Sequence, residues 1–243
     1  MKLNVKRCLI ALVLSVAICI PAFSATADEV KGYYSSLDST SCRPPVQDFI
    51  NTVNANYKYG PYVGYPSRFD SSNDSYWDSM DMGIVCAHGN RWLFALSGGY
   101  VNFASSSFGS SSSKGWGNVD MEWAVLYSCL VVASPLEVTD WYSVWIDETY
   151  DVFDRLHIIN GFRTSAWVYC ADEVTTDYAQ RLNNGGKILD AFYDAIYAEG
   201  DFGNGWDRAC SVYYDSCKND TFSSIATDPS ETSESGFKCI YIN

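Results

Sequence analysis

Short runs of consecutive apolar residues recur along the chain, separated by longer stretches with a helical repeat. Continuous apolar runs are typical of strands that are buried on both faces of a sheet. Strands that alternate with helices predict an α/β fold, a three-layer sandwich around a mostly parallel sheet. The apolar runs predict strands at 82–87, 123–127 and 156–162. Apolar residues at three- and four-residue spacing predict helices at 44–57, 137–155, 175–182 and 187–199.

Other segments have the composition of turns and loops. Two glycines between apolar stretches predict a hairpin over 91–104. Gly, Pro, Ser and Tyr dominate 59–77, which predicts a long surface loop. Small residues dominate 105–117 and predict a flexible tract. The start of the exported chain, 28–43, is expected to be irregular, and the last residues, 237–243, are expected to form a strand.

The N-terminus has the pattern of a secretory signal peptide. Three positive residues precede an apolar core at Cys8–Ile20, and Ala25 and Ala27 offer an A-x-A cleavage signal. We therefore expect residues 1–27 to be removed and residues 28–243 to form a single α/β domain. No later segment has the ~20 apolar residues of a membrane-spanning helix. The mature protein is expected to be secreted, extracellular or periplasmic, with no membrane anchor.

The net charge of the chain argues for some classes of binding partner and against others. The full chain has a formal net charge of −13, and loss of the leader removes three of its 16 Lys and Arg, which leaves 13 − 29 = −16. A surface this acidic repels phosphate backbones and argues against nucleic acid as a partner. It would favour a basic ligand or substrate.

Cysteines are numerous for a chain of this length. Two of the nine lie in the leader, which leaves seven. In an oxidising compartment most of them would form disulfides, including those of a cysteine-containing C-terminal extension from about residue 200. Because seven is odd, at least one thiol stays free or bonds between chains. The seven are Cys42, Cys86, Cys129, Cys170, Cys210, Cys217 and Cys239.

A histidine and a cysteine each follow a predicted buried strand. His88 comes after the run at 82–87, and Cys129 comes after the run at 123–127. In a parallel sheet, catalytic groups gather beyond the carboxyl ends of the strands. If the two strands are neighbours, His88 can act as a base for a nucleophilic thiol at Cys129. The backbone N–H groups of Gly89 and Cys129 would then form an oxyanion hole.

The order of these motifs resembles a known group of enzymes. An apolar strand ending in His88-Gly89, followed by an apolar strand ending in Cys129, is similar to the caspase–legumain–gingipain group of cysteine peptidases. The resemblance covers about Gly83 to Ser134 and implies a parallel α/β fold and cleavage after a charged or amide side chain. The caspase motif around the nucleophile is absent, since the chain has "LYSCLVV" with Ser128 before the cysteine.

A second resemblance covers more of the chain. From about Phe49 to Asp201 the sequence is similar to an exported microbial family of unknown function. The shared motifs are "HGN" at 88–90, "EW…SC" at 122–129 and "LH…GF" at 156–162. This resemblance implies no activity.

Structural roles compete with each catalytic assignment. His88 can be a hydrogen-bonded strand end, and Cys129 can form a disulfide, for example with Cys86. His157 begins its strand and so falls at the wrong edge of the sheet for the dyad. Cys170 is a rival nucleophile that lacks a neighbouring histidine. No Cys or His spacing of a metal site is present, so neither a metal nor another cofactor is predicted.

The sequence therefore favours a secreted, caspase-like cysteine peptidase that hydrolyses peptide bonds with a His88–Cys129 dyad. Its partner would be a peptide or protein substrate, and the oligomeric state is left open. The alternative is a non-catalytic carbohydrate- or protein-binding module on the same scaffold, with Cys129 oxidised. Eight tryptophans and eighteen tyrosines support this alternative, because exposed aromatic rings bind sugars and proteins.

Overall fold

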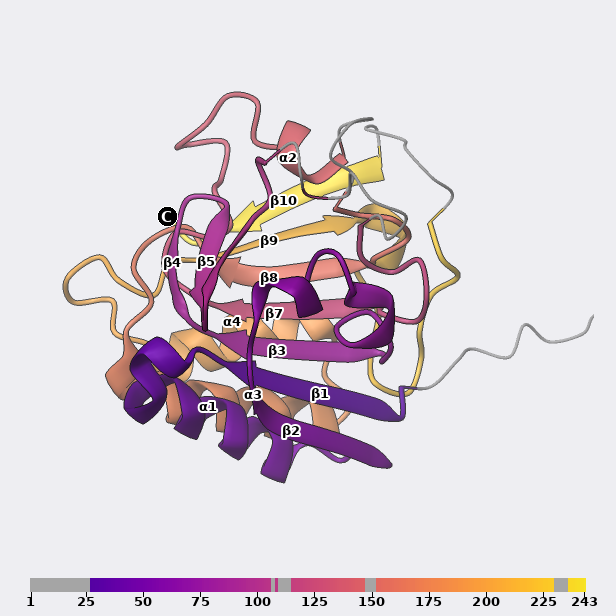
Figure 1. Ribbon diagram of the computed structural model, residues 1–243, viewed down its shortest axis with the longest axis horizontal. Helices are drawn as coiled ribbons and strands as arrows, with labels where there is room; N and C mark the ends of the chain where they lie inside the picture. The colour runs from indigo at the N-terminus through magenta and orange to yellow at the C-terminus, as the bar shows by residue number, and fades with distance from the viewer. Residues whose placement is uncertain (1–26, 106–107, 109–114, 147–151, 230–235) are drawn as a thin grey trace, which may run out of the picture.

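A seven-stranded sheet runs through the centre of the molecule (Figure 1). The computed structural model describes residues 27–105, 108, 115–146, 152–229 and 236–243. All but the last residue of the predicted leader and most of the tract at 105–117 lie outside the described residues. In sheet order, the strands are β10 (Phe237–Tyr241), β9 (Ala209–Tyr214), β8 (Ile158–Phe162), β7 (Trp123–Tyr127), β3 (Met82–Cys86), β1 (Glu29–Tyr34) and β2 (Tyr57–Val63).

Most of this sheet is parallel. Each neighbouring pair from β8 to β2 is parallel, whereas β9 and β10 add an antiparallel edge. The three strands that the apolar runs predict are confirmed as β3, β7 and β8, and all five residues of each are buried. Burial on both faces explains why these strands have continuous rather than alternating apolar residues.

Helices cover one face of the sheet (Figure 1). Phe49 and Tyr178 stack between two of these helices, with ring centroids 5.8 Å apart, and belong to the same buried cluster as Ile84 and Val125 of the sheet. The apolar side chains of each helix face the strands, as their helical spacing in the sequence predicts. The helices on this face are α1 (Ser39–Thr52), α3 (Ala171–Asn183) and α4 (Ile188–Glu199).

A small antiparallel sheet and a layer of aromatic side chains cover the other face. Trp77 and Trp116, which are fully buried, meet edge to face with ring centroids 5.3 Å apart. Phe103 joins them and links to Trp145. The result is a three-layer α/β sandwich in which aromatic loops replace part of one helical layer. The elements on this face include β4 (His88–Asn90), β5 (Leu93–Leu96), β6 (Gly99–Asn102) and α2 (Ser143–Ile146).

Five short 3-10 helices join these elements within the described residues. They are η1 (Ser36–Asp38), η2 (Pro66–Arg68), η3 (Asn73–Ser75), η4 (Val168–Cys170) and η5 (Asp215–Cys217).

Several boundaries differ from the sequence-based prediction. The helix predicted at 44–57 is α1, which begins at Ser39, contains both prolines and ends at Thr52. Part of the predicted loop at 59–77 belongs to strand β2, which tolerates Pro61 because it lies at the sheet edge. The irregular start predicted over 28–43 instead contains β1 and the first residues of α1.

The prediction of a helix over 137–155 is wrong for most of the residues that the structure describes there. Only α2 is helical there, and residues 147–151 lie outside the described residues. Apolar residues of this segment are still buried, Trp145 in the short helix α2 and Val152 in the chain that follows 147–151, outside any helix. The hairpin predicted over 91–104 is confirmed as β5 and β6, with Gly98 at a φ of +83° in the turn.

A buried carboxyl group orders the chain that enters β7. Asp78 is fully buried, and its side-chain oxygens accept hydrogen bonds from the backbone N–H groups of Gly117 at 2.6 Å and Val119 at 3.2 Å. Burial raises the pKa of Asp78 to about 7, although these hydrogen bonds oppose the shift. The folded protein therefore holds a proton that the unfolded chain has already lost at mildly acidic pH.

We expect Asp78→Asn to change the pH dependence of stability. Because the pKa of Asp78 is higher in the folded state, its stabilising contribution is present below about pH 4 and is lost as pH rises toward about 7. The free energy of unfolding of the wild type, relative to that of the variant, should fall by about 1–3 kcal/mol between pH 4 and 8. Urea denaturation at both pH values measures this difference. A constant difference would contradict the assignment, and Asp190→Asn, on an exposed side chain, is the control.

Candidate functional site

Three adjacent parallel strands end in register, so the residues that follow them lie at the same edge of the sheet. Tyr34 of β1 pairs with Cys86 of β3, and Cys86 pairs with Tyr127 of β7. His88 lies two residues after Cys86, the end of β3, and Cys129 lies two residues after Tyr127, the end of β7. The sequence-predicted dyad residues therefore leave neighbouring strands at the same carboxyl edge.

Gly89 brings the two strand ends into direct contact. A Cβ atom added to Gly89 would overlap Ser128 Oγ and would lie 2.5 Å from the carbonyl oxygen and 3.1 Å from the nitrogen of Cys129. Only a residue without a side chain fits this approach. The backbone beside His88 thus lies against the backbone of Ser128 and Cys129.

An aspartate lies beside the histidine. Asp38 ends η1, which follows β1, and its Oδ2 atom is 3.7 Å from His88 Nε2. The His88 side chain is 62% exposed and that of Asp38 is 24% exposed, so the imidazole is open to solvent. One ring nitrogen therefore faces a carboxylate, which leaves Nδ1 for another partner. Asp38 was not among the predicted site residues, because the segment around β1 was expected to be irregular.

Cys129 lies in a constrained turn. It is a partly exposed free thiol, and its Sγ atom is 3.8 Å from the carbonyl oxygen of Ala166. Leu130 has a φ of 59°, in the left-handed region that non-glycine residues rarely adopt, and its N–H donates to Thr164 at 2.8 Å. In the part of the chain that the structure describes, the Cys129 N–H donates to no backbone oxygen.

The expected disulfides are not present. All seven cysteines of the described residues are free thiols, and the predicted alternative of a Cys86–Cys129 bridge is therefore wrong for this structure. Cys86 lies next to Cys42 and is fully buried; burial and that neighbour raise its pKa well above the usual thiol value. Cys210 and Cys239 approach each other, but their Sγ atoms are 3.4 Å apart, well beyond the ~2.05 Å of a disulfide.

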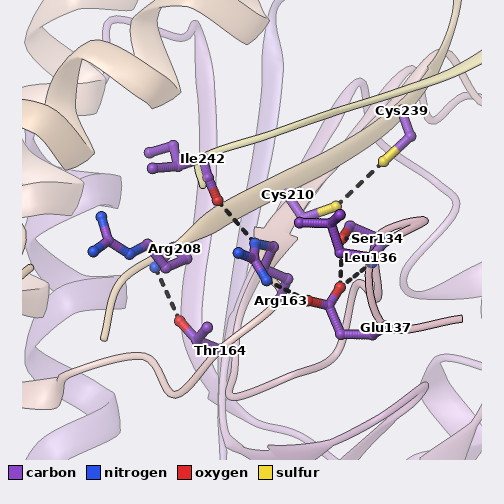
Figure 2. Close-up of polar contacts among 9 residues, drawn as sticks. All are labelled: Ser134, Leu136, Glu137, Arg163, Thr164, Arg208, Cys210, Cys239 and Ile242. Atoms are coloured by element: carbon purple, nitrogen blue, oxygen red, sulfur yellow. Dashed lines mark hydrogen bonds and ion pairs between the residues drawn. The ribbon is translucent and has the colours of Figure 1, made fainter. Parts of the chain in front are cut away.

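A charged cluster holds the segment that follows Cys129 (Figure 2). Arg163, directly after β8, pairs with Glu137 and donates from Nε to the carbonyl oxygen of Ile242 at 2.8 Å. The other carboxylate oxygen of Glu137 accepts the N–H of Ser134 at 2.9 Å. The chain after Cys129 is thereby tied to both β8 and the C-terminus.

Aromatic rings gather beside the same edge. Trp167, next to Ala166, lies with its ring centroid 3.6 Å from that of Trp206 and 4.9 Å from that of Tyr169. Tyr169 is 77% exposed. Behind them, Cys170 donates to Asp207, and burial together with that carboxylate raises the pKa of Cys170 to about 12. The rival thiol is thus held in its neutral form.

A groove of about 460 Å³ lies away from this edge, over β1 and the edge strand β2. Its walls include Tyr33, Tyr62 and Tyr76, and the guanidinium of Arg68 lies 5.2 Å from the ring centroid of Tyr76. Lys31 adds a second cation, 5.6 Å from the Tyr59 ring. Tyrosines and cations together form this surface, which we call the tyrosine groove.

One group of side chains could hold a metal ion. His157, Cys217 and Asp220 are all buried, and their ligand atoms lie within 4.8 Å of one another. His157 directly precedes β8, so this group lies at the amino edge, opposite His88 and Cys129. Burial alone would lower the pKa of His157, but the hydrogen bond to Asp220 and the contact with Cys217 outweigh it and raise the pKa to about 10.

We expect Gly89→Ala to destabilise the protein. The added methyl group would overlap Ser128 and the Cys129 backbone, and overpacking of this kind costs about 1–3 kcal/mol. Thermal or urea unfolding measures the loss. Gly236→Ala is the matched control, since its Cβ would meet its nearest neighbour at an ordinary 3.7 Å. Equal stability of the two variants would contradict the close approach at Gly89.

The comparisons with known proteins show which family the chain belongs to. No curated protein matches the chain. Among the described residues, no helix has the length and apolar character to cross a membrane. A family model described as a domain of unknown function (DUF6345) matches residues 23–241, nearly the whole chain, and this range includes both His88 and Cys129. The protein belongs to this family.

Proposed function

We propose that the protein is a cysteine peptidase in which His88 and Cys129 form the catalytic dyad. The observation that carries the proposal is the contact of Gly89 with the Ser128–Cys129 backbone. It joins the residue next to the histidine to the cysteine itself, at the carboxyl edge of two adjacent parallel strands. Catalytic groups of open α/β sheets gather at that edge.

The chemistry uses groups already in place. His88 takes the proton of the Cys129 thiol, and the thiolate attacks the carbonyl carbon of a peptide bond. The N–H groups of Cys129 and Gly89 stabilise the oxyanion, with each donor worth about 3 kcal/mol of barrier. The C–N bond breaks as His88 returns its proton to the amine. Water, activated by His88, then hydrolyses the thioester and restores the thiol.

Asp38 acts as a positioning residue in this scheme. Its carboxylate faces Nε2 of His88 at 3.7 Å, so it favours the ring orientation in which Nδ1 points away from Asp38. It also stabilises the imidazolium that forms after proton transfer. Because both side chains are partly exposed, water weakens this interaction.

The substrate would be a peptide or protein. The resemblance to the caspase–legumain–gingipain group supports this class, as does the order of a histidine and a cysteine after adjacent parallel strands. The acidic chain favours a basic substrate. Trp167 and Trp206 offer an aromatic surface next to the thiol for its side chains.

Export is part of the proposal. Cleavage before Asp28 would create a new α-amino group at that residue. The nitrogen of Asp28 lies 2.8 Å from Oδ2 of Asp81, and that of Glu29 lies 2.7 Å from the same oxygen. A positive amino group there would be neutralised by a carboxylate, which supports a mature chain that begins at this position.

We expect Cys129 to react faster than Cys170 with iodoacetamide in the native protein at neutral pH. Both thiols are partly exposed, but burial and Asp207 keep Cys170 neutral, whereas in the proposed dyad His88 ionises Cys129, and the thiolate is the reactive form. Peptide mass mapping measures both rates in one sample. His88→Ala should slow alkylation of Cys129 and leave that of Cys170 unchanged. Equal effects on both thiols, or an unreactive Cys129, would contradict the dyad.

Hydrolysis of a peptide library tests the reaction itself. Cys129→Ala should abolish cleavage, and His88→Ala should lower kcat by about 10²–10⁴-fold because general-base catalysis is lost. Cys170→Ser is the matched control and should retain activity. Cleavage that survives Cys129→Ala would assign the activity to another site.

The tyrosine groove favours a second candidate function, the binding of a carbohydrate or protein. Exposed tyrosines bind such partners through their faces and hydroxyl groups. Arg68 lies within 6 Å of the rings of Tyr33, Tyr65 and Tyr76, which keeps them grouped around one guanidinium. This function needs neither His88 nor Cys129.

We expect Tyr62→Ala and Tyr76→Ala to weaken binding to an immobilised polysaccharide array by about two- to tenfold each, the usual worth of one aromatic contact. Tyr197→Ala, at a more exposed tyrosine on α4 over the other face, is the control and should bind as the wild type does. Binding that none of these changes affects would remove the groove as the site.

A further inference from the structure

Distant segments meet at the amino edge of β8. His157 precedes the strand, Cys217 ends η5, and Asp220 follows three residues later. All three are buried, and one ligand atom from each lies within 4.8 Å of the others. The cluster lies at the opposite edge of the sheet from His88 and Cys129 and takes no part in the proposed peptide hydrolysis.

The two ring nitrogens of His157 have different surroundings. Nδ1 lies 2.6 Å from Oδ2 of Asp220. That carboxylate is itself fixed, because Oδ2 accepts the indole N–H of Trp123 at 3.0 Å and Oδ1 accepts the N–H of Ala226 at 2.9 Å. Asp220 therefore holds the imidazole in one orientation, with Nδ1 directed at its carboxylate and Nε2 on the far side of the ring.

Nε2 is a buried nitrogen without a hydrogen-bond partner among the described residues. The His157 side chain is 0% exposed, so water does not solvate the ring. A buried unpartnered polar atom costs about 1–3 kcal/mol and calls for an explanation. The nearest carboxylate is that of Asp228, with Oδ1 3.8 Å from Nε2, and the Cys217 thiol also interacts with the ring.

We propose that Nε2 of His157 and the thiolate of Cys217 bind a zinc ion, that Asp220 orients the histidine, and that the exposed carboxylate of Asp228, 3.8 Å from Nε2, moves in as a third ligand. Imidazole, thiolate and carboxylate are the donors that zinc takes in proteins. Two ligands about 2 Å from a tetrahedral ion stand ~3.3 Å apart, close to the separation of Nε2 and Asp228. A carboxylate on the second ring nitrogen is the usual partner of a zinc-bound histidine.

The surroundings favour a cation. Glu122, directly before β7, has an unpartnered buried oxygen and interacts with His157, Asp81 and Asp120. No Lys or Arg of the described residues forms an ion pair with these groups. A divalent ion would stabilise this acidic edge and fasten the segment at 215–228 to the sheet.

Cobalt substitution tests the site on the full protein. After removal of metals with a chelator, addition of Co²⁺ should produce the charge-transfer absorption of a cobalt–thiolate bond, saturating at one ion per chain, and Zn²⁺ should displace it. Cys217→Ser should abolish this absorption, and Cys170→Ser, the matched control, should retain it. Absence of the absorption in the wild type, or its presence in Cys217→Ser, would overturn the proposal.

Two further variants keep the test decisive if Cys217→Ser does not fold. Asp228 is 60% exposed, so Asp228→Asn should fold and should bind zinc at least tenfold more weakly. Asp220→Asn should weaken binding by about 10–100-fold, the usual effect of losing a carboxylate behind a zinc-bound histidine. Competition with a chromophoric chelator measures both affinities. Unchanged zinc affinity in both variants would overturn the proposal.

Discussion

In-register pairing of β3 with β7 is the constraint on which the candidate site depends. The pair Cys86–Tyr127 ends both strands, and neighbouring strands lie ~4.8 Å apart. His88 and Cys129 therefore start from positions one strand spacing apart. A slip of one residue would turn every side chain of β7 to the opposite face, and the large Trp123 and Tyr127 would then have to fit on the face that now packs Ala124 and Leu126. The packing of the core thus fixes the geometry of the edge.

The two edges of the sheet have different physical characters. The carboxyl edge is formed by the turns after β1, β3, β7 and β8, and it keeps an exposed imidazole and a partly exposed thiol. The amino edge instead buries acidic groups against tryptophan. Burial, reinforced by Asp81, raises the pKa of Glu122 to about 9, because this edge opposes a further negative charge. The open edge suits exchange with a substrate, and the closed edge suits a permanent ligand.

The parts of the structure that were predictable from the sequence are those that depend on local patterns. Continuous apolar runs predicted β3, β7 and β8, and the strand ends then suggested that His88 and Cys129 are neighbours. β1 was missed because "EVKGYY" mixes charge, glycine and tyrosine, although Gly32 is required where Val46 of α1 packs on the strand. With β1 went Asp38. The contact of His157 with Asp220 joins residues 63 positions apart, and no local pattern reports such a contact.

The surroundings of the seven cysteines single out one thiol for chemistry. Cys42, Cys86, Cys210 and Cys217 are buried, which denies access to a substrate. Cys239 lies beside Cys210, and Cys170 faces the carboxylate of Asp207, which opposes its ionisation. Cys129 is partly exposed, follows the strand next to the one that His88 follows, and has an N–H without a backbone acceptor in the described chain. In the proposed mechanism His88 is the base and this N–H is a donor for the oxyanion.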